Sequence, residues 1–454
     1  MSQLDVATLF TANIIRALLV AGVVALVWGR FSGHGLKLSH LPLLGQKGQA
    51  NFYKALEDAY YNCKSLRRIP MRRHDIVWVP PKFISEVSAL PESKVSVALD
   101  SATRFHGKYT GLGIIDFHFV DVIRIHVTRN LAKMFVPEDL AKNSVWVDLM
   151  INYTVVSMQA VEELHSYPMW THPVVARFLP KCRVITDYRR RARDLLRPIL
   201  EERRRLVDTD PTFVMPPDTL SWIIKEKGEG GWDPDYQARV QILIGVGSIH
   251  TTTNALSNTL FDIISTPGVT DELRTEYIDT LAANGGKMNK IALNSLVKFD
   301  SVMRESQRLN PSHAIAIGRM TTADLKLSDG EVVPRNTHFL FSSAAANKDP
   351  SVYASPDVFD PWRFVKLREA ETNKADEGKW QFVATGPNSL GFGHGTHACP
   401  GRFFASNEMR LILGNLLLRY EFKFGDGIGR PRSLLGETTI LPDTKTKVLI
   451  KSCK

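Results

Sequence analysis

The sequence GFGHGTHACPGR occupies residues 391–402, and an apolar run to Leu418 follows it. Three glycines precede Cys399, and glycine permits both positive φ angles and a close approach of the backbone. Pro400 suits the first turn of a helix, where its missing N–H costs nothing. A cysteine at this point meets unpaired amide donors and the positive end of the helix dipole, which both favour a thiolate. The pattern predicts a loop that presents Cys399 as a ligand, the alternative being a structural cysteine after an ordinary glycine loop.

This stretch resembles the haem-binding loop of the cytochrome P-450 superfamily of haem-thiolate monooxygenases, F-G-x-G-x-[HR]-x-C-x-G. Its fixed positions are filled by Phe392, Gly393, Gly395, His397, Cys399 and Gly401. The resemblance implies a mainly α fold with a large helical domain and a small β-rich lobe. It also implies a haem b whose iron takes Cys399 as axial ligand, with Phe392 and His397 among the cofactor-binding residues and His397 at a propionate. It covers residues 40–450 and is weakest between 135 and 185.

The composition is that of a globular protein, with 454 residues of which 44% are hydrophobic and 23% charged. The four cysteines lie far apart without a C-x-x-C pair, which argues against a disulfide framework or a zinc knuckle and suits a reducing compartment. A net charge of +10 fits an anionic membrane or an acidic protein partner. Since no nucleic-acid motif accompanies this charge, we expect no nucleic-acid partner.

The segment Val6–Trp28 is the candidate membrane segment of the sequence. Its uninterrupted apolar part, Ala17–Trp28, is shorter than the roughly 20 residues that cross a bilayer. Extension back to Val6 buries Asn13 and Arg16, and an arginine in the bilayer is unfavourable. An uncleaved anchor and a cleaved signal peptide are therefore both open, and the absence of a small-x-small cleavage site favours the anchor.

Microsomal members of the family begin with such an anchor and a proline-bearing hinge. The resemblance therefore implies an anchor at residues 1–30, a hinge at 31–48 and a catalytic domain at 49–454. We expect the protein at the endoplasmic reticulum membrane, with its catalytic domain in the cytosol.

Several elements are expected before the central helix. Helices are predicted at 50–67, 83–90 and 119–135, and a buried strand at 75–79. In the family, a tryptophan and an arginine four positions on hold a haem propionate from the helix at 119–135. Arg124 fits the arginine, although Val120 stands at the tryptophan position, and a solvated surface arginine is the alternative. The chain between Phe135 and Trp146 is shorter than the family's helices require, which predicts a truncated helix or a lost segment.

Residues 188–205 are strongly basic and carry leucines at helical spacing. Arg189–Arg191 and Arg203–Arg205 bracket the apolar positions. This spacing favours an amphipathic helix with a solvated basic side over a nucleic-acid surface.

Residues 236–265 predict one long helix of about 45 Å. Glycines and three adjacent threonines in its middle are unfavourable for a plain helix, which suggests that a threonine hydroxyl binds a carbonyl one turn back. The stretch 247–252 resembles the family's distal helix, [AG]-G-x-[DE]-T-[TS], except that Ser248 and His250 replace a glycine and an acid. The resemblance implies that Thr251 holds dioxygen and orders water for proton delivery. His250 is either a proton relay or a structural residue.

A charged cluster is expected on the next helix, 296–309. Glu305 and Arg308 lie on one face at i, i+3. The segment 359–364 resembles the family's P-E-R-F motif, whose arginine, here Arg363, completes a Glu-Arg-Arg cluster. The resemblance assigns these three residues to folding and haem retention. Arg319 stands where the family has an arginine that binds a propionate, and 319–341 predicts paired strands with a turn at 328–330.

The resemblance implies a haem-dependent monooxygenase that inserts one oxygen atom from O2 into a hydrophobic substrate. Small and apolar residues at 311–317 suit a bulky substrate, and the I-H-T-T pattern suggests a fungal secondary metabolite of terpenoid or mixed origin. The chain has no dinucleotide fingerprint, so electrons from NADPH require a separate NADPH–cytochrome P-450 reductase. Arg402 and Lys298 are candidates for docking it. The alternatives are a haem-thiolate isomerase or dehydratase, and a haem-binding relict with a disrupted pocket.

Overall fold

A computed structural model describes residues 38–46, 49, 51–71, 75–91, 93–96, 100, 119–425 and 427–453. The predicted anchor and the beginning of the predicted hinge lie outside these residues. In the part of the chain that the structure describes, no helix is both long and apolar enough to cross a membrane.

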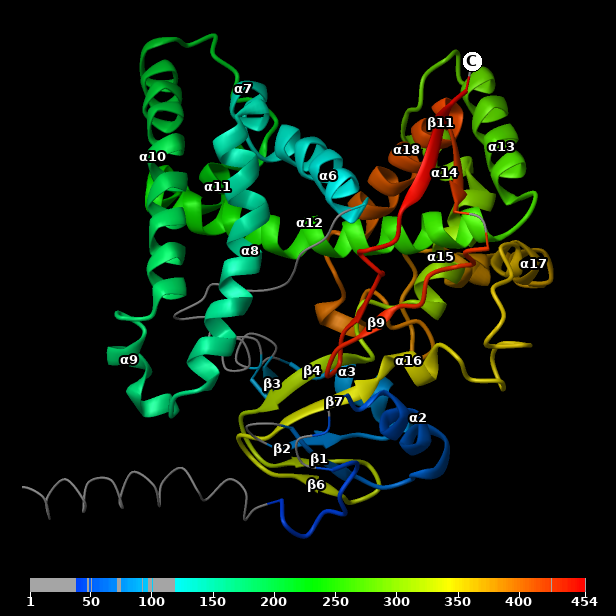
Figure 1. Cartoon of the computed structure of the whole chain (residues 1–454). Helices are drawn as coiled ribbons and strands as arrows, with labels where there is room; N and C mark the ends of the chain where they lie inside the picture. The colour runs from blue at the N-terminus through cyan, green and yellow to red at the C-terminus, as the bar shows by residue number, and fades with distance from the viewer. Residues whose placement is uncertain are drawn as a thin grey trace, which may run out of the picture.

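The helical part is built around α12 (Pro234–Ser265), a 32-residue helix that crosses the molecule (Figure 1). Asp233 caps it by accepting the backbone N–H of Asp235 at 2.9 Å. It packs against α6, α8, α10, α15 and α18. The other helices are α2 (Tyr53–Asn62), α3 (Ile84–Ser88), α6 (Phe119–Phe135), α7 (Glu138–Lys142), α8 (Ser144–His165), α9 (His172–Val175), α10 (Pro180–Thr209), α11 (Thr219–Lys227), α13 (Val269–Ala283), α14 (Lys290–Ser295), α15 (Val297–Leu309), α16 (Ser343–Ala346), α17 (Arg363–Glu369) and α18 (Arg402–Arg419).

Short 3-10 helices join several of these elements. They are η1 (Pro81–Phe83), η2 (Met169–Thr171), η3 (Gly228–Trp232), η4 (Lys374–Trp380) and η5 (Gly395–His397).

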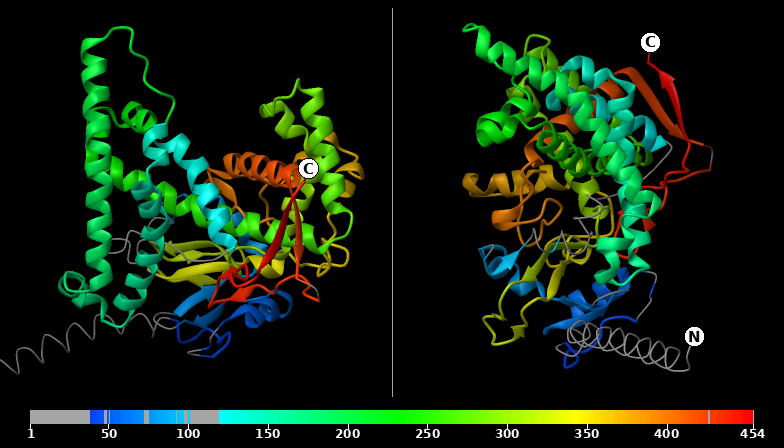
Figure 2. Two further views of the ribbon diagram at one scale, coloured as in Figure 1. Left: turned by 45° about the horizontal axis from the view of Figure 1, so that its top comes forward. Right: turned by 90° about the vertical axis from the view of Figure 1, so that its left-hand side faces the viewer.

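A five-stranded sheet forms the β-rich lobe and lies with α2 at one end of the molecule (Figures 1 and 2). Its order is β1-β2-β7-β4-β3, and only the pair β2 and β7 is parallel. All five residues of β7 are buried because the strand is central in the sheet. The strands are β1 (Arg67–Pro70), β2 (Asp75–Trp78), β3 (Val95–Ser96), β4 (Ile315–Thr321) and β7 (His338–Ser342). Within the described residues, three antiparallel pairs lie outside this sheet. They are β5 (Leu325–Lys326) with β6 (Val332–Val333), β8 (Tyr420–Phe424) with β11 (Val448–Ser452), and β9 (Leu434–Leu435) with β10 (Ile440–Leu441).

The buried apolar side chains are divided between the helical part and the β-rich lobe. One cluster of buried side chains joins the helices around α12, and two smaller clusters lie within the β-rich lobe. The predicted fold class, mainly α with a small β-rich lobe, is confirmed.

The predicted helix at 50–67 was wrong at its C-terminal end. The helix stops at Asn62, and Cys63 is extended (φ −108°, ψ 127°). Residues 67–70 then pair with β2, where Arg67 faces Trp78 and Pro70 faces Asp75. Pairing with a distant strand thus outweighs the local helical pattern.

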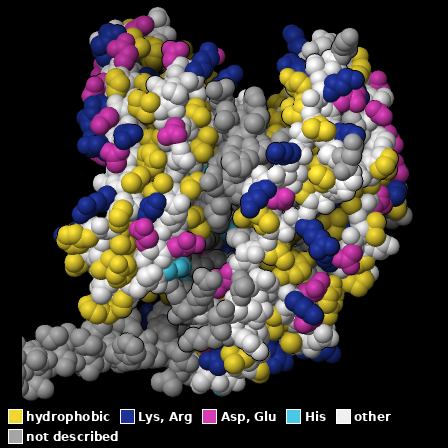
Figure 3. All heavy atoms as spheres, in the orientation of Figure 1, with side chains coloured by type: hydrophobic (Ala, Val, Ile, Leu, Met, Phe, Trp, Pro, Cys, Tyr) yellow, Lys and Arg dark blue, Asp and Glu magenta, His cyan; other side chains and the backbone are white. Residues whose placement is uncertain are grey.

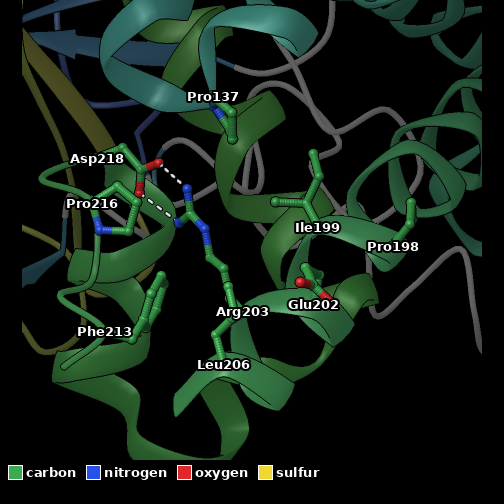
Figure 4. A pocket seen from close by; sticks show the side chains of 9 residues that line it. All are labelled: Pro137, Pro198, Ile199, Glu202, Arg203, Leu206, Phe213, Pro216 and Asp218. Carbon is green, nitrogen blue, oxygen red and sulfur yellow. Dashed lines mark hydrogen bonds and ion pairs between the residues drawn. The ribbon is translucent and has the colours of Figure 1, made fainter. Parts of the chain in front are cut away.

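The solvated basic side predicted for 188–205 was wrong at Arg203. Its side chain is buried in α10 and donates from Nη1 to Asp218 Oδ1 at 2.8 Å, while Nη2 bonds Oδ2 (Figure 4). A buried guanidinium requires such a two-point partner. The pair lies beside an open, apolar pocket of about 500 Å³ between α10 and residues 213–218. The neighbours Arg204 and Arg205 are exposed, as predicted.

Between α6 and α8 the chain forms only the five-residue helix α7. The long α8 begins directly afterwards, with Asn143 accepting the N–H of Val145 at 2.8 Å as its cap. Whether this region is shortened relative to the family stays a prediction.

Candidate functional site

The cysteine loop has the geometry that its glycines predict. Gly393 and Gly395 have φ angles of 69° and 76°, which are unfavourable for other residues. The loop then turns so that the backbone N–H of Cys399 donates to the carbonyl oxygen of Phe392 at 2.8 Å. The Cys399 side chain is half-buried, and α18 begins three residues later.

The same loop packs closely on the β-rich lobe. A Cβ atom added at Gly395 would lie 2.3 Å from the carbonyl oxygen of Ser88, in α3. No side chain fits in that space. The loop therefore contacts the β-rich lobe through Gly395 and continues into the helical domain through α18.

Phe392 supports the loop from the helical side. Its ring meets the buried ring of Phe382 edge to face, with centroids 5.1 Å apart. Arg402 donates from Nη1 to the carbonyl oxygen of Cys399 at 2.8 Å. Contacts on both sides of Cys399 thus fix its backbone.

One face of α12 is open. Arg239, Leu243, Gly247 and Thr251, spaced by four residues, are exposed, and the helix is otherwise mostly buried. Among the described residues, a Cβ atom added at Gly247 would meet nothing within 4 Å, whereas one at Gly245 would lie 2.2 Å from Met150 Cε. Free space therefore lies beside Gly247 and Thr251, and the opposite side of α12 packs against α8.

Hydroxyl groups in the middle of α12 bond backwards along the helix. Thr251 Oγ1 donates to the carbonyl oxygen of Gly247 at 2.8 Å, and Thr253 Oγ1 to that of Ile249 at 2.6 Å. The predicted bond one turn back is therefore present. His250 is only 3% exposed, so its side chain does not share the open face that carries Thr251.

The charged cluster on α15 is fully assembled. Glu305 is completely buried and accepts two bonds of 2.8 Å from Arg308. Arg363, at the start of α17, donates to the same carboxylate at 3.0 Å, and the backbone N–H of Asp360 donates at 3.1 Å. The other N–H groups of Arg308 and Arg363 donate to carbonyl oxygens of the segment 347–358.

The remaining predicted site residues lie on separate elements. Arg319 is buried in β4, immediately after an irregularity where Ile317 has a φ of 51°. His397 is exposed at the end of η5. The backbone of Arg124 belongs to α6, and its side chain lies outside the described residues.

These features fit a planar iron macrocycle held by one thiolate. A Cβ atom at Gly401 would lie 3.9 Å from Cys399 Sγ, so the glycine leaves one side of the sulfur uncovered. The open face of α12 offers uncrowded space at Gly247 and Thr251. When bound, a thiolate-ligated haem supplies O2 activation, because the thiolate donates electron density that favours cleavage of the O–O bond.

Two buried carboxylates on helices of this site, Asp300 and Glu408, were not predicted from the sequence. Asp300, in α15, bonds two arginines from other helices. Glu408, in α18, is 6% exposed, and no described group hydrogen-bonds either of its carboxylate oxygens. Glu408 lies on the apolar side of a predicted helix, a signal that could have singled it out.

The comparisons with known proteins agree with this site. The family model described as cytochrome P-450 matches residues 150–450. The cytochrome P-450 monooxygenase AN1598 of Emericella nidulans is 32% identical, over 90% of this chain and 85% of that protein. The cytochrome P-450 monooxygenase BOA4 of Botryotinia fuckeliana is 29% identical over 90% of both chains. The solved structure of a retinoic acid bound cyanobacterial CYP120A1 matches with a TM-score of 0.62 at 15% identity, covering 91% of this chain and all of that one.

Two features together define a haem-thiolate protein. Cys399 is half-buried at the end of a glycine loop, and the long helix α12 has an open face that carries Thr251. The chain belongs to the cytochrome P-450 family and is an oxygen-incorporating oxidoreductase with haem-thiolate iron.

Proposed function

We propose that this monooxygenase inserts one oxygen atom into a bulky hydrophobic compound, a fungal secondary metabolite of terpenoid or mixed origin. The observation that carries the proposal is the open face of α12, where apolar Leu243 and small Gly247 leave room beside Thr251. Apolar Ile315 and Ala316, which are half-buried at the start of β4, support a bulky apolar ligand. The fungal origin of the similar monooxygenases supports the substrate class.

The site residues take the following proposed roles. Cys399 ligates the iron of a haem b, and Phe392 supports its loop. His397, Arg319 and Arg124 bind the propionates. Thr251 holds dioxygen and orders water for proton delivery, because its hydroxyl lies on the open face of α12. His250 relays protons, and Glu305, Arg308 and Arg363 retain the fold around the cofactor.

Electrons come in this proposal from NADPH through a separate reductase. The net charge of +10 favours an acidic partner. Arg402 supports docking near the iron ligand, because it bonds the carbonyl of Cys399. Lys298 is a weaker candidate, since its ammonium group is paired with Glu272 at 2.5 Å.

The protein also binds the endoplasmic reticulum membrane in this proposal, with the catalytic domain 49–454 in the cytosol. An exposed apolar patch supports a membrane contact, and we call it the 167–178 patch. Figure 3 shows hydrophobic side chains gathered over η2 and α9. Five large ones are 41–66% exposed there: Tyr167, Met169, Trp170, Val174 and Phe178. Exposed Arg177 and Arg183 accompany them, as expected for a surface that meets anionic lipid.

The test uses the purified holoenzyme with a fungal reductase, NADPH and a panel of terpenoid substrates under ¹⁸O2. We expect products that carry one ¹⁸O atom and require NADPH. A product that forms without NADPH and without ¹⁸O would instead identify an isomerase or dehydratase. A reduced, carbon monoxide-bound spectrum without the thiolate-type Soret band would identify a disabled relict.

Substitution of Thr251 tests the proposed oxygen-binding role. Thr251→Ala should lower product formed per NADPH consumed by about tenfold or more and release hydrogen peroxide, because proton delivery is disturbed. Thr259→Ala is the matched control, since Thr259 makes the same bond on α12, to the carbonyl of Ala255 at 2.7 Å, in the buried half of the helix. Equal coupling in both variants would remove Thr251 from the mechanism.

A further inference from the structure

Asp300 connects three elements that surround the cysteine loop. It lies in α15 with 1% of its surface exposed. Its carboxylate bonds the guanidinium groups of Arg368, from α17, and Arg410, from α18. It also accepts the backbone N–H of Phe382 at 2.9 Å. One buried carboxylate therefore holds two helices and the segment that follows η4.

The segment after η4 is fixed at a second point by the neighbouring Arg304. Its guanidinium donates to the carbonyl oxygens of Lys379 and Gln381 at 2.7 and 2.5 Å. It also stacks over the ring of Phe364, 4.4 Å from the centroid. Burial lowers the pKa of Arg304. The carbonyls at 379 and 381 and the amide at 382 are thus all bonded to α15.

Two routes lead from Asp300 to Cys399. On one side, Phe382 packs its ring on Phe392, whose carbonyl oxygen accepts the N–H of Cys399 at 2.8 Å. On the other side, Arg410 belongs to the helix that begins directly after the cysteine loop. Both ends of the cysteine loop are thus connected to the Asp300 carboxylate, one through Phe382 and the other through Arg410.

The Glu305 cluster does not make these contacts. Glu305 bonds Arg308, Arg363 and the amide of Asp360, and so holds the chain before α17. Neither arginine of Glu305 belongs to α18. Both carboxylates of α15 therefore hold α17, but of the two only Asp300 also bonds α18 and the amide of residue 382.

We propose that Asp300 is a positioning residue for the Cys399 ligand, fixing the cysteine loop from both sides through Phe382 and Arg410. This rests on the proposed role of Cys399 as the iron ligand. Loss of the Asp300 charge leaves Arg410 buried, and Arg368 partly buried, without their charged partner, which is strongly unfavourable for Arg410. The cysteine loop then becomes more mobile, and the Cys399 sulfur occupies a wider range of positions.

The test compares Asp300→Asn with the wild-type holoenzyme by two readouts that do not depend on turnover. We expect the thiolate-type Soret band of the reduced, carbon monoxide-bound form to give way largely to a thiol-type band. We also expect hydrogen exchange at the Cys399 amide to accelerate by about tenfold or more, since its bond to Phe392 opens more often.

Asp218→Asn is the matched control. It breaks another buried carboxylate–arginine pair, with Arg203, whose side chains are 8% and 6% exposed. We expect it to lower thermal stability without changing either readout at Cys399. Equal changes in the two variants would show general destabilisation and overturn the proposal, as would unchanged readouts in Asp300→Asn.

A second pair of variants covers the case in which Asp300→Asn does not fold. Arg410→Lys keeps the charge beside Asp300, and Arg410→Met removes it. We expect the lysine variant to keep the larger part of the thiolate-type band and the methionine variant to lose it, whereas equal bands would overturn the role of Arg410. If the wild-type protein itself lacked the band, the ligand role of Cys399 would fail instead.

Discussion

The partners of Glu305, Arg308 and Arg363, were predicted from the sequence. The structure shows that its side chain is completely buried. Replacement by Gln keeps the shape but leaves Arg308 and Arg363 buried without a negative partner. Breaking such a pair typically costs about 3–5 kcal/mol. We therefore expect Glu305→Gln to accumulate as protein with little haem, measured as the ratio of Soret to protein absorbance.

A surface pair provides the comparison for Glu305. Glu229 and Arg204 are 80% and 45% exposed, and solvent screening makes the contribution of such a surface pair to stability small. Glu229→Gln should keep its haem. Full haem content in Glu305→Gln would exclude the proposed role in haem retention.

Burial of Glu408 makes the stability of the protein depend on pH. Burial raises the pKa of this carboxyl to about 8, above the usual value of 4.5. The folded protein therefore keeps a proton that the unfolded chain releases. The stabilising contribution is complete below pH 4.5 and is lost as the pH rises to about 8.

Glu408→Gln should remove this dependence. At pH 8 the variant should be more stable than the wild type by a few kcal/mol, and the difference should shrink toward pH 5. Denaturant unfolding at both pH values measures the effect. A constant difference between the two proteins would show that Glu408 does not titrate in this range.

At the scale of elements, the link between α8 and α10 carries the 167–178 patch. Trp170 is 54% exposed there, and Trp222 on α11 is 47% exposed outside the patch. With vesicles of phosphatidylcholine and phosphatidylserine that carry brominated chains, we expect quenching of Trp170 fluorescence, because the patch enters the interface. Because Trp28 ends the predicted anchor and would also be quenched, all proteins compared carry Trp28→Phe. In that background Trp170→Phe should remove the quenched component, and Trp222→Phe should keep it. The reverse result would place another surface at the membrane.

Elements with a strong internal pattern were predicted close to their observed ends. The helix predicted at 236–265 is α12, and that at 296–309 is α15. The turn at 328–330 joins β5 and β6, with Gly330 at a φ of 91°. The helix at 50–67 failed because its last residues pair with β2. Local pattern cannot foresee a bond to a strand that comes later in the chain.

At the scale of the whole molecule, α15 is the element that joins the parts of the site. It packs against α12, α17 and α18 and carries both Glu305 and Asp300. The cysteine loop also contacts the β-rich lobe, through Gly395 and α3. The position of Cys399 is therefore a property of the assembled molecule rather than of its loop alone.

The sequence by itself determined the loop that carries Cys399, because that loop depends on residue types at fixed spacing. Through the family resemblance of this and other motifs, it also implied the fold class and the Glu305, Arg308 and Arg363 set. Only the tertiary structure decided that Arg203 is buried, that Asp300 bonds Arg368, Arg410 and the amide of Phe382, and that Glu408 is enclosed without a hydrogen-bonding partner among the described residues. The reason is physical. The environment of a charged side chain depends on groups that folding brings together from far along the chain, such as Asp300 and Arg410.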